Sequence, residues 1–149
     1  MLGYNFRMMD IQAAIGLVQL RRLEGFNDLR IKNAEYLNRH LKQDGLETPL
    51  RREDVKHVYH QYAITIEDSF PISRDALINY LKERGIGSAV HYPLPVHRQP
   101  LYQGLGYRDE DVRCPVSLEL SQKILSLPIH PSVGDQDLRY IVDTINRME

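Results

Sequence analysis

Several features that mark particular protein classes are missing from this sequence. It has a single cysteine, Cys114, so an intrachain disulfide framework is excluded, which fits a reducing compartment. It has no excess of either charge, because 19 basic residues face 20 acidic ones and leave a formal net charge of −1. Without a basic field to attract nucleic acid or anionic lipid, we expect neither as a partner.

Long apolar segments are also absent. No run approaches the roughly 20 residues that a membrane-spanning helix needs. The first residues lack the charged, apolar and small-residue sections of a signal peptide. The sequence therefore predicts a soluble, cytoplasmic protein with no membrane partner.

The six histidines do not have the spacing of a metal site. There is no His-x-x-x-His pair on a predicted helix and no pair of cysteines. His57 and His60 lie three apart on a predicted strand, which places them on opposite faces. We therefore expect no metal. A glycine-rich phosphate loop is also missing, because "GLGY" at 104–107 has neither the required spacing nor a preceding strand.

The 149 residues suit one domain, which at this length can bury about two thirds of the surface of its unfolded chain. The segment 7–23, "RMMDIQAAIGLVQLRRL", predicts a helix with apolar residues around most of its circumference. Such a helix needs cover on several sides. We expect another chain or a further domain to pack on it.

The rest of the chain alternates helical and extended patterns. Residues 26–43 predict a helix with one buried face, and Gly45 follows as a stop. The alternation in 57–66, "HVYHQYAITI", predicts a strand. A helix begins at an N-capping Ser73 and ends at Gly85, and a second strand covers residues 86–91.

Two helices complete the prediction. One covers about 115–125 and is followed by a short extended piece. The other follows Ser132 and Asp135, which have the spacing of a capping box, and it presents Leu138 and further aliphatic residues on one face. The fold class is therefore α+β, with helices packed on a small sheet.

The stretch "VHYPLPVHRQPLY", residues 90–102, is unusual because two histidines and two tyrosines are interleaved with three prolines. Each proline fixes its own φ and favours an extended residue before it, which predicts a stiff, mostly extended loop. Stiffness reduces the entropy lost on binding. His91, Tyr92 and His97 are then candidate ligand contacts. Alternatively, the prolines merely end a strand, and backbone groups satisfy His91.

Four ordered blocks of this sequence resemble a known family. They are "GYNFRMMDIQAAIGLVQLRRLEGFNDLRIKNAEYLNRHL", "HVYHQYAITI", "LKERGIGSAVHYPLPVHRQPLY" and "CPVSLELSQKILSLPIHPSVGDQDLRYIVDTI". Together they resemble the C-terminal portion of the DegT/DnrJ/EryC1/StrS family. These enzymes are aminotransferases that depend on pyridoxal phosphate (PLP) and act mostly on nucleotide-linked keto-sugars. The resemblance covers essentially all 149 residues.

The resemblance implies the small C-terminal domain of a fold-type I PLP aminotransferase, with helices on a small, mainly antiparallel sheet. Residues 1–149 would form this one domain, beginning with an inter-domain helix at about 7–23, and the large domain would be absent. The five lysines, none of which matches the family's Schiff-base motif, are Lys32, Lys42, Lys56, Lys82 and Lys123. We therefore expect no covalently bound cofactor and no activity from this chain alone, whether it is a fragment, a truncated reading frame or half of a split enzyme.

The resemblance also implies roles for particular residues. Asn5 would reach the PLP phosphate of the neighbouring subunit in a homodimer. Arg7, His91, Tyr92 and His97 would bind substrate, and Arg7 has the guanidinium fork that suits a carboxylate or phosphate. The substrates of the complete enzyme would be a sugar nucleotide and an amino donor, expected to be glutamate. The alternatives are a regulatory or ligand-binding domain without catalysis, or an oligomerisation unit.

Overall fold

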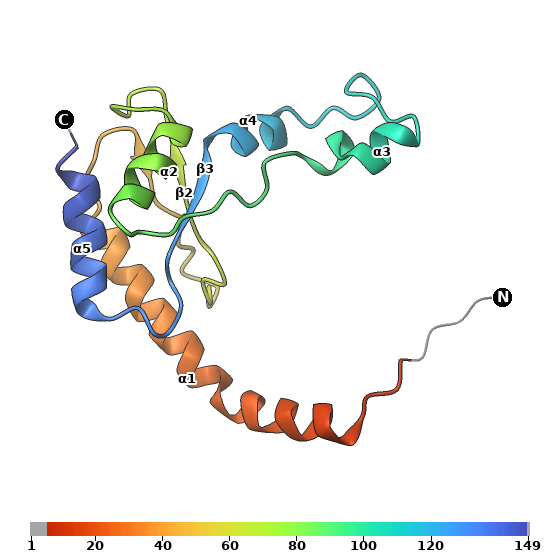
Figure 1. Ribbon diagram of the computed structural model, residues 1–149, viewed down its shortest axis with the longest axis vertical. Coiled ribbons are helices and arrows are strands. Elements are labelled where there is room, and N and C mark those ends of the chain that lie inside the picture. Colours follow the sequence, from red (N-terminus) through yellow and green to blue (C-terminus); the bar gives the residue numbers. More distant parts are fainter. Residues whose placement is uncertain (1–5, 149) are drawn as a thin grey trace.

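The computed structural model describes residues 6–148 (Figure 1). Long and short helices alternate with the strands of one small sheet. In chain order the elements are α1 (Asp10–His40), β1 (Leu46–Glu47), β2 (Tyr62–Ile66), α2 (Arg74–Glu83), the 3-10 turn η1 (Val96–Arg98), α3 (Pro100–Gly104), α4 (Pro115–Lys123), β3 (Ile124–Leu127) and α5 (Asp135–Asn146). Within this part of the chain, no helix is long and apolar enough to cross a bilayer.

The sheet is antiparallel throughout and has the order β1-β2-β3. Leu46 pairs with Ile66 on one side of β2, and Tyr62 pairs with Leu127 on the other. Alternate residues of β2, beginning with Tyr62, are buried, as the period of two predicts. The α+β class and the mainly antiparallel sheet are therefore confirmed.

The core lies among the sheet, α2, α5 and the second half of α1. Its fully buried members include Leu37, Ile64, Leu77, Leu125 and Ile145. Polar contacts reinforce the packing of α1 on α5: the Asn146 side chain donates to the carbonyl of His40 (2.8 Å) and accepts from the backbone N–H of Lys42 (3.0 Å). These bonds satisfy backbone groups that the end of a helix leaves without partners.

The first helix differs from the prediction, because one continuous helix, α1 (Asp10–His40), replaces the two helices predicted for 7–23 and 26–43. Gly25 lies inside it, and a single interior glycine costs only about 1 kcal/mol. The first half projects away from the other elements (Figure 1). There Ile11 is 72% exposed and Ile15 59% exposed. The expected apolar surface is therefore present and has no cover within residues 6–148.

The strand predicted for 57–66 begins only at Tyr62. Tyr59 has a φ of +46°, in the left-handed region, and this turn interrupts the alternation. Tyr59 is buried and Val58 is exposed, so the buried set of β2, which begins with Tyr62, does not extend back through Val58. His57 accepts a hydrogen bond from the Tyr59 N–H at Nδ1 (2.9 Å). The placement of His57 and His60 on a strand was therefore wrong.

The predicted strand 86–91 is reduced to one bridge between Ala89 and Ser126. The chain then leaves the sheet as the α3 segment (residues 92–114), which lies beyond α4 at one end of the molecule (Figure 1). It contains η1 and α3, so a mostly extended loop was wrong. Pro100 and Pro115 begin α3 and α4, because the fixed φ of proline suits the first helical position.

The helix ends agree in part with the sequence prediction. Ser73 caps α2 by accepting from the N–H of Ala76 (3.3 Å), and Gly85 follows with a φ of +73°. The last helix begins later than predicted. Its capping contact joins the Gly134 N–H to the Asp137 carboxylate (2.9 Å), rather than involving Ser132.

Candidate functional site

A pocket of about 510 Å³ lies between the α3 segment and α4. The stretch 91–97 forms one of its sides and brings His91, Tyr92 and His97 to the same cavity. Tyr102, Tyr107 and Leu120 add apolar and aromatic surface. An apolar cavity with a few converging polar groups is the usual form of a small-molecule site. The structure therefore brings three of the candidate residues together.

His91 is half-buried at the edge of this pocket. Its Nδ1 lies 3.1 Å from the hydroxyl oxygen of Ser126 on β3. The ring of Tyr92 stands edge-on to it, with centroids 5.7 Å apart, and the peptide bond between the two residues is cis. Tyr92 itself is 71% exposed, so a ligand can reach its ring. The alternative in which backbone groups satisfy His91 is wrong, because its partner is a side chain.

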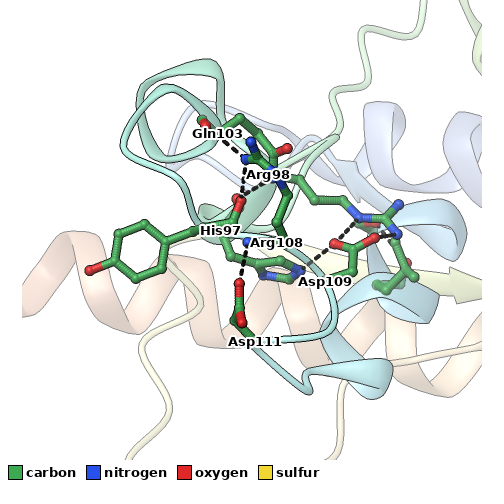
Figure 2. Close-up of polar contacts among 9 residues, drawn as sticks. His97, Arg98, Gln103, Arg108, Asp109 and Asp111 are labelled. Carbon is green, nitrogen blue, oxygen red and sulfur yellow. Dashed lines mark hydrogen bonds and ion pairs between the residues drawn. The ribbon is translucent and has the colours of Figure 1, made fainter.

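His97 is more enclosed, with a side chain that is 10% exposed. Its Nε2 lies 3.3 Å from the Asp109 carboxylate (Figure 2). Arg98 pairs with the same carboxylate through two nitrogens, and its Nε donates at 2.9 Å. The hydrogen bond from Arg98 is the main reason why the pKa of Asp109 is below its usual value.

Further polar contacts hold the α3 segment in shape (Figure 2). Gln103 donates to the carbonyl of His97 (2.9 Å), and Arg108 donates in turn to the carbonyl of Gln103 (2.9 Å). The backbone N–H of Arg108 donates to Asp111 (3.2 Å). His97 therefore belongs to a network within the segment as well as to the pocket. Its role in substrate binding stays a prediction.

The remaining predicted contacts are not part of this pocket. Asn5, the expected cofactor contact, lies outside the described residues. Arg7 lies before α1, is exposed, and does not line the pocket. Its expected substrate role also stays a prediction. Of the predicted substrate contacts, His91, Tyr92 and His97 line this pocket and Arg7 does not.

Sequence reasoning missed several residues of the site. Tyr107 and Tyr102 line the pocket with their rings edge-on, 5.8 Å apart. Tyr102 was within the stretch that drew attention, but nothing in its spacing distinguished it. Asp109 stands eleven residues after Arg98, in a segment without periodicity. No local sequence signal could therefore have joined them.

A second pocket, of about 730 Å³, shares His91 with the first. Arg30 and Asp137 supply opposite charges to its lining, and Ser126 belongs to it too. The Arg30 guanidinium donates to the carbonyl of His60 (3.3 Å). His91 therefore stands where two cavities meet.

The lysines of the described residues lie outside the candidate pocket. None of the five lysines lines the 510 Å³ pocket. Lys56 pairs with Glu24 at 2.7 Å, and Lys123 pairs with Glu119 and Glu67 at 2.7 Å each. These two carboxylates raise the pKa of Lys123, with Glu119 the larger cause, which favours its charged form. Residues 6–148 also contain no group of three metal-ligating side chains.

Comparison with known families gave one match that spans nearly the whole chain. The sequence model of the DegT/DnrJ/EryC1/StrS aminotransferase family matches residues 1–146.

Two relatives and one solved structure illustrate the likeness. The pleiotropic regulatory protein of Geobacillus stearothermophilus is 36% identical over 97% of this chain and 38% of its own length. The UDP-N-acetyl-3-dehydro-α-D-glucosamine 3-aminotransferase of Acidithiobacillus ferrooxidans is 32% identical over 98% and 37%. The structure of Spr1654 from Streptococcus pneumoniae in its PLP form gives a TM-score of 0.82 at 26% identity, over 94% of this chain and 35% of that one. This chain thus spans less than two fifths of each.

Proposed function

Because this chain belongs to the DegT/DnrJ/EryC1/StrS aminotransferase family, we propose that it is the C-terminal part of a PLP-dependent enzyme. That enzyme transfers an amino group from glutamate to a nucleotide-linked keto-sugar. We assign the sugar nucleotide to the 510 Å³ pocket. The observation that carries this assignment is the convergence of His91, Tyr92 and His97 on one cavity.

The chemistry of the pocket suits such a ligand. The rings of Tyr92, Tyr102 and Tyr107 offer flat apolar surface to a sugar or a base. The nitrogens of His91 and the hydroxyl of Tyr92 can hydrogen-bond to hydroxyl, carbonyl or phosphate oxygens. The contacts between Arg98 and Asp109 and between Gln103 and His97 hold the segment in place before binding, which lowers the entropy that the ligand must overcome.

The cofactor belongs to the complete enzyme in this proposal. PLP acts as the electron sink of transamination and needs a lysine to hold it. No lysine of residues 6–148 lines the pocket, so in this proposal the lysine belongs to the large domain. This chain supplies substrate contacts and is inactive alone.

The exposed half of α1 suits a homodimer. Ile11, Ile15, Leu17 and Leu20 are each more than half exposed on it. Apolar surface of this extent, when contiguous, marks an association site. We propose that the large domain and a second subunit cover this surface in the complete enzyme. We also propose that the enzyme acts in the cytoplasm.

Binding to the chain itself tests the assignment of the pocket. Uridine diphosphate and L-glutamate are titrated separately into the ¹³C-labelled chain, with detection of the histidine and tyrosine ring signals. We expect uridine diphosphate to shift the signals of His91 and Tyr92, and glutamate to leave them unchanged.

Substitutions of the His91 and Tyr92 side chains measure how much each contributes to binding. His91→Ala or Tyr92→Phe removes one hydrogen bond, which costs about 0.5–1.5 kcal/mol, or up to about 3 if the partner is a charged phosphate. The dissociation constant should rise from about twofold to over a hundredfold. The matched controls are His130→Ala and Tyr140→Phe, because both residues are exposed and neither lines the pocket. If the controls weaken binding as much as the pocket variants, the assignment is wrong.

The complete enzyme adds a test of which half-reaction the pocket serves. With the large domain present, His91→Ala and Tyr92→Phe should lower kcat/KM for the keto-sugar nucleotide and leave the glutamate half-reaction nearly unchanged. A parallel fall in both half-reactions would mean that the stretch is structural.

A second candidate is a regulatory, ligand-binding role without catalysis. The observation in its favour is the name of the Geobacillus stearothermophilus relative, a pleiotropic regulatory protein. The two functions differ in one measurement. Added large domain should restore amino transfer to the sugar if the chain belongs to an enzyme, and should restore none if it is regulatory.

A further inference from the structure

Ser126 lines the 730 Å³ pocket, which shares His91 with the 510 Å³ pocket. It lies on β3 between the buried Leu125 and Leu127 and is itself only 7% exposed. Its backbone N–H donates to the carbonyl of Ala89 (2.8 Å), and its carbonyl accepts from the N–H of Ala89 (3.2 Å). This bridge fixes the main chain two residues before His91. The side chains of Ser126 and His91 then meet at 3.1 Å.

The proton in this contact can be placed by counting donors and acceptors. The neutral imidazole has one protonated nitrogen, and a hydroxyl group carries one hydrogen that it can donate. Within residues 6–148, His91 Nδ1 is the one hydrogen-bond partner of the Ser126 hydroxyl. Ser126 is only 7% exposed, and a largely buried hydroxyl is destabilising when its hydrogen has no acceptor. Donation to Nδ1 therefore favours the neutral ring in which Nε2 carries the hydrogen.

We propose that Ser126 is a positioning residue that sets both the orientation and the tautomer of His91, so that the ring offers an Nε2–H donor to a ligand oxygen. The ligand part of this inference rests on the proposed function of the pocket. A donor on His91 suits the acceptor oxygens of a diphosphate or a sugar carbonyl.

A positioning role and a purely structural role of Ser126 predict different NMR results. A residue that only ties residue 91 to β3 would affect stability and ring position, whichever nitrogen carried the proton. A residue that selects the tautomer also changes the ¹⁵N shifts of the ring nitrogens. Which nitrogen carries hydrogen is set in general by the bond that the other one makes.

Nitrogen NMR of the ¹⁵N-histidine-labelled chain, at a pH where the ring is neutral, tests this directly. In the native chain we expect His91 Nδ1 to show an unprotonated shift and Nε2 a protonated one. In Ser126→Ala the two shifts should move toward each other as the tautomers exchange. Ser126→Thr keeps the hydroxyl and should restore the native pattern.

The control is Ser121→Ala. Ser121 is equally buried, at 7% exposed, but its hydroxyl donates to the carbonyl of Leu118 (2.7 Å). This variant should leave the His91 shifts unchanged. Unaltered shifts in Ser126→Ala would overturn the proposal. A protonated Nδ1 in the native chain would also overturn it, and that measurement needs no variant to fold.

Titration with uridine diphosphate tests the proposed ligand independently of the role of Ser126. If the pocket binds it, Ser126→Ala should raise its dissociation constant by about 2- to 10-fold, and Ser126→Thr by less than twofold. If uridine diphosphate leaves the His91 Nε2 signal unmoved in the native chain, the proposed ligand is wrong. The tautomer result then still decides the role of Ser126.

Discussion

Replacement of Gly45 and of Gly85 by alanine should lower the stability of the chain by different amounts. Both glycines have a positive φ, +72° and +73°, so replacement by alanine places an L side chain in the left-handed region at each. At Gly85 an added Cβ meets nothing within 4 Å. At Gly45 it would lie 2.7 Å from the Cα of Phe70 and closer still to the Phe70 nitrogen.

The difference between the two costs can be worked from these contacts. A left-handed conformation costs an alanine about 1–2 kcal/mol, and the reduced entropy of its unfolded chain returns about 0.4–1 kcal/mol. Gly85→Ala should therefore destabilise the chain by about 1 kcal/mol. Gly45→Ala adds an overlap with backbone atoms, which cannot rotate away, and overpacking costs about 1–3 kcal/mol more.

The Phe70 backbone has little freedom to move. Its N–H donates to the carbonyl of Glu67 (3.0 Å), and the N–H of Glu67 donates to the carbonyl of Gly45 (2.8 Å). The Phe70 side chain is buried in the core. An outward shift of this turn would therefore disturb both the hydrogen bonds and the packing.

Urea denaturation followed by circular dichroism, at one protein concentration, measures the free energy of unfolding of both variants. We expect Gly45→Ala to lose about 2–4 kcal/mol and Gly85→Ala about 1. Equal losses would refute the reasoning, because they would mean that the Phe70 backbone yields without cost. A lower m-value in one variant would show that its unfolding is no longer comparable.

Three further outcomes are expected. Addition of PLP followed by borohydride should not label any one lysine stoichiometrically. Such labelling, located by mass spectrometry, would contradict the expectation that this chain carries no Schiff-base lysine. Light scattering should show that the chain self-associates through α1. The double variant Ile11→Glu, Ile15→Glu should associate less, and the control Gln19→Glu should match the native chain. A native chain that stays monomeric at high concentration would refute this. The Asp109 pKa is lowered in the fold, so its stabilising contribution is complete above the unfolded value of about 3.9 and is lost as pH falls through the lower folded value. The protection factors of the amides in residues 96–113, which correct for the intrinsic pH dependence of exchange, should therefore fall on acidification. Asp109→Asn should remove much of that fall, and protection factors that do not change with pH would exclude the role of this carboxylate.

Local sequence patterns determined much of the fold. The alternation of Tyr62, Ile64 and Ile66 predicted the faces of β2, because a strand turns successive side chains to opposite sides. The hydroxyl of Ser73 and the glycine at 85 marked the ends of α2, because caps act over three or four residues. The ordered blocks predicted the family, since they span nearly the whole chain.

Tertiary structure decided what depends on distant partners. Nothing local shows that Tyr59 adopts a positive φ and ends the strand pattern, or that α1 continues through Gly25. The partners of the candidate histidines are also remote in sequence: Ser126 lies 35 residues from His91, and Asp109 follows the predicted loop. The prolines of 90–102 did not indicate that η1 and α3 form there. The shape of this segment came from contacts between side chains that only the folded chain brings together, because sequence periodicity encodes faces of helices and strands and carries no information on such pairs.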